Sequence, residues 1–230
     1  MKSILLSLLL LPVLALANEA EITVKAPVDL GNHASLQRGA RTFVNYCLNC
    51  HSANYMRYNR LQDIGLSEKQ IKDNLLLAGD KVGDTMQVAI DPKDAKKWFG
   101  ATPPDLSVEV RARGADWLYA YLRGFYKDDT RPTGWNNTVY DKVAMPHVLY
   151  ELQGVQVLNH ETHALELVKP GKLSPAEYNE MVGDLTNFMA FMAEPAKQSR
   201  QFIGIFVLLF LGVLFVLVKK IKTEYWKDIK

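Results

Sequence analysis

The spacing of apolar side chains predicts three amphipathic helices before residue 126. From Ser35, a good N-cap residue, apolar positions recur every three to four residues as far as Cys47, as they do along one face of a helix. Gly39 lies inside this segment, where the absence of a side chain allows another helix to approach closely. Similar patterns predict a short helix over 68–77 and a helix rich in aromatic residues over 116–125.

A longer helix is predicted near the C-terminus, and loops dominate much of the rest. Ser174 and Glu177 form a capping box with a proline in the first helical position, so a helix is expected to begin there. Its apolar stripe consists of Met181, Leu185, Phe188, Met189 and Met192. Glycine and proline punctuate 79–107 and 127–172, which are expected to be mostly loop, with two strands near 154–168. The expected fold class is therefore mainly α, with long loops.

Residues 202–218 contain no charged side chain and predict a transmembrane helix. This segment reaches roughly 25 Å at about 1.5 Å per residue, and flanking lysines and aromatic residues can extend it into the headgroup zone. The alternative, a buried core helix, would normally keep a polar stripe. Lysines are concentrated in the tail at 219–230, so the positive-inside tendency places this tail in the cytoplasm and 18–201 on the other side of the membrane.

The N-terminus has the pattern of a secretory signal peptide. Lys2 precedes an apolar run over 4–16, and an Ala-x-Ala sequence ends at Ala17. A membrane anchor is the alternative interpretation, but the run is short for a span. Removal of 1–17 would leave 18–201 as a periplasmic domain, which is the orientation that the basic tail indicates independently.

The charge balance excludes one class of function. A formal net charge of +2 over 230 residues argues against a nucleic-acid-binding protein. Once the charges of the leader and the tail are set aside, the periplasmic domain carries about −2. Such a domain is compatible with a basic soluble partner.

The strongest chemical signal is the C-x-x-C-H motif formed by Cys47, Cys50 and His51. This spacing is typical of covalent c-type haem, with both thiols bound to one porphyrin and the histidine bound to its iron. A thioredoxin-like redox pair, a zinc site and a structural disulfide are the alternatives. The first lacks a βαβ context, and the second lacks a further cysteine pair, because the chain has only two cysteines. We therefore expect one covalent haem with His51 as an iron ligand.

A second axial ligand is expected from a methionine or a histidine elsewhere in the chain. The methionines of the last helix are expected to be core residues. Met86 and Met145 lie in loop-rich stretches, where a side chain can be directed at a haem, and Pro146 stiffens the backbone after Met145. His147 and His33 are further candidates. A histidine–methionine pair would fill both axial positions and would suit an electron carrier rather than a catalyst.

Haem propionates need cationic or hydrogen-bonding partners when they are partly buried. The candidates around the predicted aromatic helix are Arg111, Arg113, Arg123, Trp117, Tyr119 and Tyr121. For each arginine, a solvated surface charge is the alternative interpretation.

Beyond the haem motif, several segments resemble the cytochrome c1 family, the haem subunits of cytochrome bc1 complexes (ubiquinol–cytochrome c oxidoreductases), in its bacterial form. These segments are Trp98-Phe99-Gly100, Pro103-Pro104-Asp105-Leu106-Ser107, Arg111-Ala112-Arg113, Arg131-Pro132-x-Gly134-Trp135-Asn136-Asn137 and Val143-Ala144-Met145-Pro146-His147-Val148-Leu149. The haem motif alone is common to all c-type cytochromes. The Pro-Pro-Asp-Leu-Ser segment together with one C-terminal anchor is far more specific.

The resemblance implies a cytochrome c core of crossed terminal helices with long insertions, in which Gly39 would meet the last helix near Phe188. It also implies that Met145 is the second ligand of the haem c iron. By the same resemblance, Arg113 matches a position that contacts a propionate, Pro104 belongs to the cofactor-binding residues, and Trp117 falls near a family tyrosine with a role like that of Arg113.

The function implied by the resemblance is one-electron relay from the Rieske iron–sulfur protein to cytochrome c. The anchor would pack against cytochrome b in a dimeric complex of the bacterial inner membrane, and the subunit would not be an enzyme by itself. An anchored monohaem subunit of a terminal oxidase or a nitric-oxide reductase is the alternative, since it would share the haem motif and the anchor. A haem peroxidase would need an open iron position, and a membrane thiol reductase would keep two free thiols.

Overall fold

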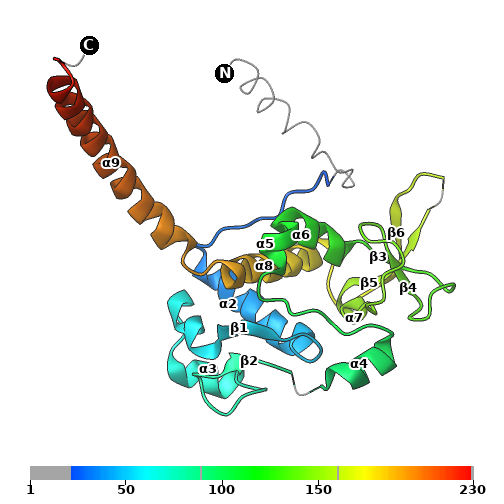
Figure 1. Cartoon of the computed structure of the whole chain (residues 1–230). Coiled ribbons are helices and arrows are strands. Elements are labelled where there is room, and N and C mark those ends of the chain that lie inside the picture. Colours follow the sequence, from blue (N-terminus) through cyan, green and yellow to red (C-terminus); the bar gives the residue numbers. More distant parts are fainter. Residues whose placement is uncertain (1–21, 89, 160, 229–230) are drawn as a thin grey trace.

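Helices α2 (His33–Thr42) and α8 (Pro175–Ala193), far apart in the sequence, pack across each other at the centre of the molecule (Figure 1). Gly39 makes this close packing possible. A Cβ atom at Gly39 would lie 2.1 Å from the carbonyl oxygen of Asp184 and 2.7 Å from the Cβ atom of Phe188. The expected meeting of the first and last helices of the domain is therefore confirmed.

The start of α2 differs from the prediction. Asn32, rather than Ser35, caps the helix, because its side-chain oxygen accepts a hydrogen bond of 3.1 Å from the backbone N–H of Ser35. Asparagine and serine are equally good caps, so spacing alone does not separate them. At its other end, α2 continues into a π-helical turn, η2 (Phe43–Cys47), in which the N–H of Leu48 donates to the carbonyl of Phe43 at 3.0 Å.

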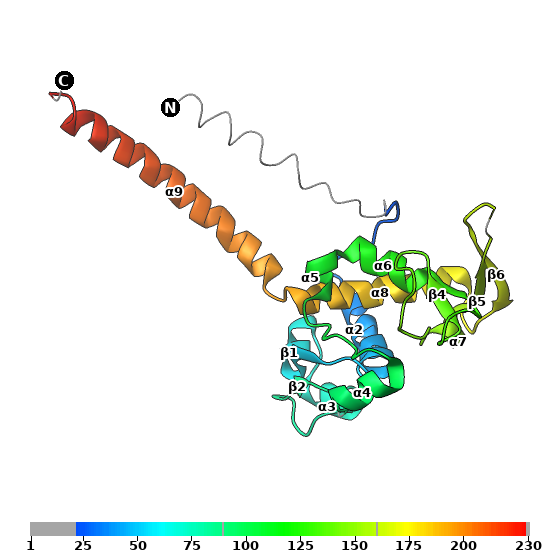
Figure 2. The ribbon, with the colours of Figure 1, turned by 45° about the vertical axis from the view of Figure 1, so that its right-hand side comes forward.

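The computed structural model describes residues 22–88, 90–159 and 161–228, and within them two further helices complete the core around α8. Helices α5 (Glu109–Arg113) and α6 (Ala115–Arg123) pack against α8, so that α8 is buried along most of its length (Figure 2). The predicted capping box of Ser174 and Glu177 is confirmed.

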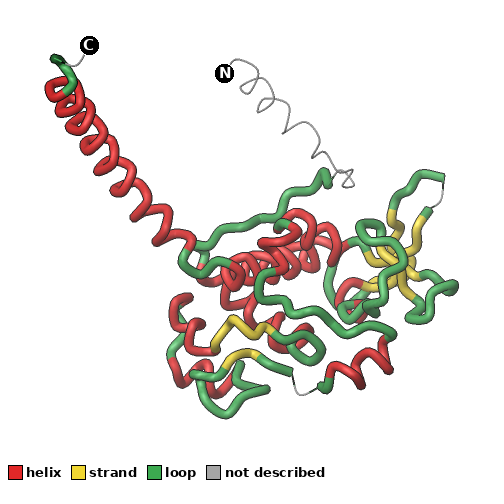
Figure 3. Tube along the Cα trace, viewed as in Figure 1, coloured by secondary structure: helices red, strands yellow, loops and turns green. Residues whose placement is uncertain are grey.

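The long connections carry short strands and helices on the outside of this core (Figure 3). Among the described residues, three antiparallel pairs of strands are present: β1 (Ala53–Arg57) with β2 (Thr85–Met86), β3 (Phe125–Lys127) with β4 (Trp135–Asn137), and β5 (Gly154–Leu158) with β6 (Leu165–Pro170). The last pair confirms the strands predicted near 154–168. The short helices are η3 (Tyr58–Ile64), α3 (Glu68–Asn74), α4 (Pro92–Phe99) and α7 (Tyr150–Gln153).

The prediction of mostly loop over 79–107 was wrong at α4. Asp91 caps this helix by accepting hydrogen bonds from the backbone N–H groups of Lys93 and Asp94, and Pro92 takes the first helical position. These start signals are present in the sequence, but the glycines and prolines on either side of this segment led to the prediction of a loop.

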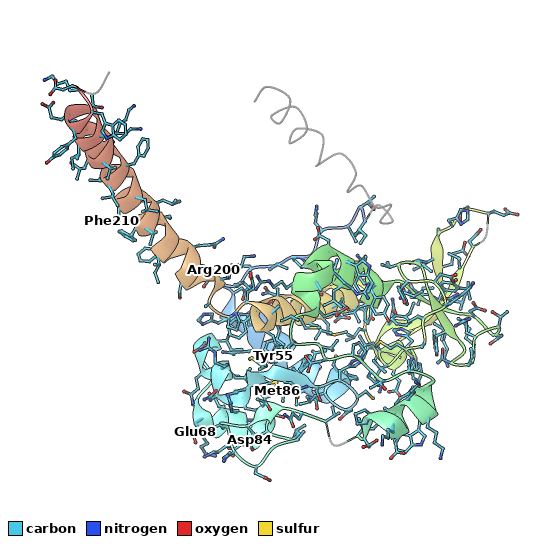
Figure 4. All side chains as sticks on the ribbon, in the orientation of Figure 1. Tyr55, Glu68, Asp84, Met86, Arg200 and Phe210 are labelled. Carbon is cyan, nitrogen blue, oxygen red and sulfur yellow. The ribbon has the colours of Figure 1, made fainter. Side chains whose placement is uncertain are left out.

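Helix α9 (Lys197–Tyr225) projects from the domain as a single rod (Figure 1). Its most apolar window has a mean hydropathy of 2.9, and none of its described side chains is buried. Side chains such as Phe210 point outward from the helix with no neighbouring element, as Figure 4 shows. The alternative of a buried core helix is therefore wrong, and α9 is long and apolar enough to span a membrane. The predicted signal peptide, 1–17, lies outside the described residues.

Candidate cofactor site

An apolar cavity of about 330 Å³ collects the residues that the sequence singled out. Cys47, Cys50, His51, Pro104 and Met145 all line it, although they are spread over almost a hundred positions of the chain. The remaining walls come from the end of α4, from α6 and α8, and from loops, and include Phe99, Trp117, Tyr121, Tyr140, Leu185 and Met189. A concave, mainly apolar space with a few convergent polar groups is the usual form of a cofactor site.

The end of helix η2 presents Cys47 to this cavity, and the turn that follows presents Cys50. The backbone N–H groups of Cys50 and His51 both donate to the carbonyl of Cys47, at 3.0 Å and 2.9 Å, which closes a tight turn around the motif. The two thiols are not joined in a disulfide. Burial, and to a smaller extent the neighbouring Cys50, raises the pKa of the Cys47 thiol to about 12, so this thiol stays protonated at neutral pH.

The imidazole of His51 is oriented by a backbone carbonyl. Its Nδ1 atom lies 2.8 Å from the carbonyl oxygen of Pro104. A carbonyl oxygen can only accept, so Nδ1 must carry the proton, and the lone pair of a neutral ring is then on Nε2. Burial lowers the pKa of His51, which favours this neutral form, although the hydrogen bond to Pro104 opposes the shift. A histidine with one nitrogen bonded in this way and the other free is prepared to ligate a metal.

The segment that carries Pro104 is tied to the haem motif by further hydrogen bonds. The backbone N–H of Leu106 donates to the carbonyl of Ser52 at 2.9 Å, and the N–H of Asn54 donates to the carboxylate of Asp105 at 2.8 Å. Although burial opposes ionisation of Asp105, hydrogen bonds from Ser107 and Asn54 hold its pKa below the usual value. These hydrogen bonds fix the Pro-Pro-Asp-Leu-Ser segment, and the carbonyl of Pro104 in this segment fixes the orientation of His51.

Met145 reaches the same cavity from a loop with a rigid base. His147, two residues later, is buried, and its ring stacks on the ring of Phe125 with centroids 4.7 Å apart. The His147 ring also meets the Trp135 ring nearly at right angles, with centroids 5.0 Å apart. The hydroxyl group of Tyr121 lies 3.5 Å from the sulfur of Met145. Packing after Pro146 therefore limits the positions that the Met145 side chain can take.

The other candidate ligands differ in their access to the cavity. Met86 lies on β2 (Figure 4), where it is fully buried and pairs with Ala53, and it is not among the residues that line the cavity. His147 is also absent from the lining, and His33 lines a separate hollow at the base of α9. Met189 of α8 does line the cavity, although the sequence suggested only a core role. Met145 is thus the loop methionine that reaches the two cysteines and His51.

The three candidate arginines go to three different places. Arg111 pairs with Glu194 at the far end of α8, and the guanidinium of Arg123 donates to the side chain of Asn179, so neither lines the cavity. Arg113 does not line the cavity either, but it binds Glu109 at 2.6 Å and lies 4.5 Å over the ring of Trp117, and both of these partners are lining residues. Of the three arginines around the aromatic helix, Arg113 is therefore the one whose partners line the cavity, and its contact with a propionate stays a prediction.

This set of donors fits a covalently attached haem. Two thiols, a neutral imidazole with a free nitrogen and a thioether sulfur border one apolar cavity. A redox dithiol would need a lowered thiol pKa, whereas burial raises the pKa of Cys47. A zinc site would need about four ligands, and no group of three or more His, Cys, Asp or Glu suited to a metal occurs among the residues that the structure describes.

Comparisons with known proteins extend over nearly the whole chain. The model described as "Cytochrome C1 family" matches residues 23–229. The chain is 52% identical to the ammonia monooxygenase gamma subunit of Nitrosomonas europaea, over 99% of this chain and 98% of that protein. It is 49% identical to cytochrome c1 of Allochromatium vinosum, over 96% of each. A solved chain described as hyperthermophilic respiratory Complex III covers 85% of this chain and 77% of its own length, with 16% identity and a TM-score of 0.42. The match of the family model to almost every residue, and of a curated cytochrome c1 at nearly half identity, shows that the chain belongs to the cytochrome c1 family.

Proposed function

We propose that this chain is the haem subunit of a bacterial cytochrome bc1 complex and relays single electrons from the Rieske iron–sulfur protein to cytochrome c. The observation that carries the proposal is the convergence of Cys47, Cys50, His51 and Met145 on one apolar cavity, in a chain of the cytochrome c1 family. Haem c, when bound there, supplies a reversible one-electron couple.

The residues of the chain would attach, orient and shield this group. Cys47 and Cys50 would hold it covalently, and His51, oriented by the carbonyl of Pro104, would offer Nε2 to the iron. Met145 would supply a sulfur ligand, and Arg113 would bind a propionate by exchanging its contact with Glu109. Because His51 and Met145 would both bind the iron, they would exclude a substrate from it, so the subunit would carry electrons without catalysing a reaction by itself.

The position of α9 supports a membrane-anchored arrangement. We infer that the domain over 18–201 lies in the periplasm, that 202–218 cross the inner membrane and that the basic tail over 219–230 lies in the cytoplasm. The exposed apolar side chains of α9 would pack against cytochrome b within a dimeric complex. Purification of the tagged chain from membranes should recover cytochrome b and a Rieske protein.

The ligand assignment has a direct test. Met145→Leu should keep the covalent haem, since the cysteines are unchanged, but should lose the charge-transfer band between methionine sulfur and ferric iron and lower the reduction potential by on the order of 0.1 V or more. His51→Ala should prevent stable assembly of the haem. Haem-stained denaturing gels, absorption spectra and redox titration measure these outcomes. An unchanged spectrum and potential in Met145→Leu would show that another residue is the ligand.

Other membrane complexes are the competing assignments. An anchored cytochrome subunit of a terminal oxidase or a nitric-oxide reductase would co-purify with a haem–copper-type subunit or its nitric-oxide-reducing relative. The Nitrosomonas europaea relative is named as an ammonia monooxygenase subunit, which suggests a third test. If this chain had such a role, its purification would recover monooxygenase subunits. Recovery of either set in place of cytochrome b and a Rieske protein would overturn the proposed complex, while leaving the haem assignment intact.

A further inference from the structure

The hydroxyl group of Tyr121 is directed at the sulfur of Met145. The two atoms are 3.5 Å apart, which is within hydrogen-bonding distance for the large, weakly accepting sulfur of a thioether. Among the described residues, Met145 is the side-chain hydrogen-bond partner of the Tyr121 hydroxyl. The sulfur has no proton to give, so the hydroxyl is the donor.

Packing fixes the direction of this hydroxyl. The Tyr121 ring stacks on Trp117 with centroids 4.9 Å apart and planes at 10°, and it meets Phe125 edge-on at 5.2 Å. Only 9% of the residue is exposed, so the ring has little room to rotate. The ring of His147, which anchors the Met145 loop, stacks on the other partner, Phe125. Tyr121 and the Met145 loop are therefore built on one common aromatic wall.

A hydrogen bond to a ligating sulfur has a predictable effect on its iron. A thioether sulfur has two lone pairs, so it can donate one to a metal and still accept a hydrogen bond with the other. The positive end of the O–H dipole withdraws electron density from the sulfur and places positive charge close to the iron. Both effects favour the electron-rich, reduced state over the oxidised state, and weaken the bond between sulfur and ferric iron.

We propose that Tyr121 is a positioning residue that donates a hydrogen bond to the Met145 sulfur, raising the reduction potential of the haem and loosening the hold of Met145 on ferric iron. The inference rests on the proposed function, in which Met145 is an iron ligand. It assigns Tyr121 a different role from the propionate contact considered for it in the sequence, because its hydroxyl faces the ligand sulfur.

The test removes one oxygen atom and leaves the aromatic wall. Tyr121→Phe in the full-length, haem-loaded chain should shift the reduction equilibrium about three- to tenfold toward the oxidised state, which is about 30 to 60 mV at 59 mV per tenfold change for one electron. Tyr119→Phe is the matched control on the same helix. The Tyr119 hydroxyl donates to the carbonyl of Asn179 on α8 and does not line the cavity, so the potential should not change.

A second measurement separates this role from a merely structural one. Imidazole added to the ferric protein competes with Met145 for iron, and its apparent affinity should fall about three- to tenfold in Tyr121→Phe, since the sulfur holds ferric iron more tightly. If Tyr121 only packs against the loop, the variant should instead loosen Met145 and raise the affinity for imidazole. Site-specific 3-fluorotyrosine at position 121 makes the hydroxyl a stronger donor and should raise the potential, which keeps the test decisive if Tyr121→Phe fails to assemble.

The outcomes distinguish this inference from the proposed function. If the unaltered protein shows no methionine-to-iron charge-transfer band, and Met145→Leu does not alter the spectrum, the ligand assignment itself has failed. If that band is present and Tyr121→Phe matches Tyr119→Phe in both potential and imidazole affinity, the inference about Tyr121 is wrong, while Met145 remains the ligand.

Discussion

At the scale of single residues, Gly39 determines how closely α2 and α8 can approach. In Gly39→Ala the new Cβ atom would lie 2.1 Å from the backbone oxygen of Asp184, which cannot rotate away. We expect the free energy of unfolding of the detergent-solubilised holoprotein to fall by about 3 kcal/mol or more, the upper end of the cost of overpacking. Urea denaturation followed by circular dichroism measures this loss.

Gly83→Ala is the matched control for that substitution. Nothing lies within 4 Å of a Cβ atom built at Gly83, so its free energy of unfolding should change by no more than about 0.5 kcal/mol. Equal losses in the two variants would contradict the close helix crossing, because both would then reflect only a general cost of replacing glycine.

The sequence indicates which side chains carry the proposed chemistry, but not the contacts that orient them. The haem motif is local, so its spacing alone specifies both cysteines and His51. The contact of His51 with Pro104 spans 53 positions, and that of Tyr121 with Met145 spans 24. Such contacts depend on the path of loops, and apolar periodicity carries no information about that path.

At the scale of elements, the most readily predicted helix was the one in which a long apolar stripe follows a clear start signal. Helix α8 could be predicted because nineteen residues of periodic pattern follow a complete capping box. Helix α4 has eight residues and was missed, and α6 ended at Arg123 because Phe125 begins a strand. The apolar spacing over 35–47 did not distinguish the π-helical turn η2 from a continued α-helix, yet this turn sets where Cys47 enters the cavity.

A small ion-pair network fixes the junction between α8 and α9. Glu194, at the end of α8, lies 3.3 Å from the guanidinium of Arg111 on α5 and 3.2 Å from that of Arg200 on α9. Arg200 sits at the base of the anchor (Figure 4). The Glu194 side chain is only 18% exposed, but both arginine side chains are largely exposed, so each pair contributes little free energy by itself. The Glu194 carboxylate nevertheless links α5 of the domain to the first turn of α9 and helps to set the direction of the anchor.

Glu194→Gln should loosen this junction without unfolding the domain. Spin labels at Lys93→Cys on α4 and Leu208→Cys on α9 should show a broader distance distribution by pulsed electron paramagnetic resonance, while the free energy of unfolding changes by less than about 1 kcal/mol. Glu224→Gln is the control, since its ion-pair partner among the residues that the structure describes is Lys227, at the other end of the anchor. Identical distributions in both variants would show that Pro195 and the backbone alone set the angle.

At the scale of the whole molecule, the cavity and the anchor are structurally independent. Every lining residue of the cavity belongs to positions 46–189, and no described side chain of α9 is buried against the domain. A chain ending at Gln201 keeps Arg200 and its pair with Glu194 but lacks the apolar span. The hydrophobic surface that it loses faces outward in the structure, so removing it uncovers no part of the core.

We therefore expect this truncated chain to be released in soluble form, with covalent haem, an unchanged methionine-to-iron band and a thermal midpoint within about 3 °C of the full-length protein in detergent. Ultracentrifugation, absorption spectra and calorimetry measure these properties. The full-length chain, exported in the same cells, should remain in the membrane pellet after a high-salt wash. Loss of the methionine-to-iron band on truncation would mean that α9 contributes to the position of Met145, because the ligand loop would then depend on the anchor for its stability.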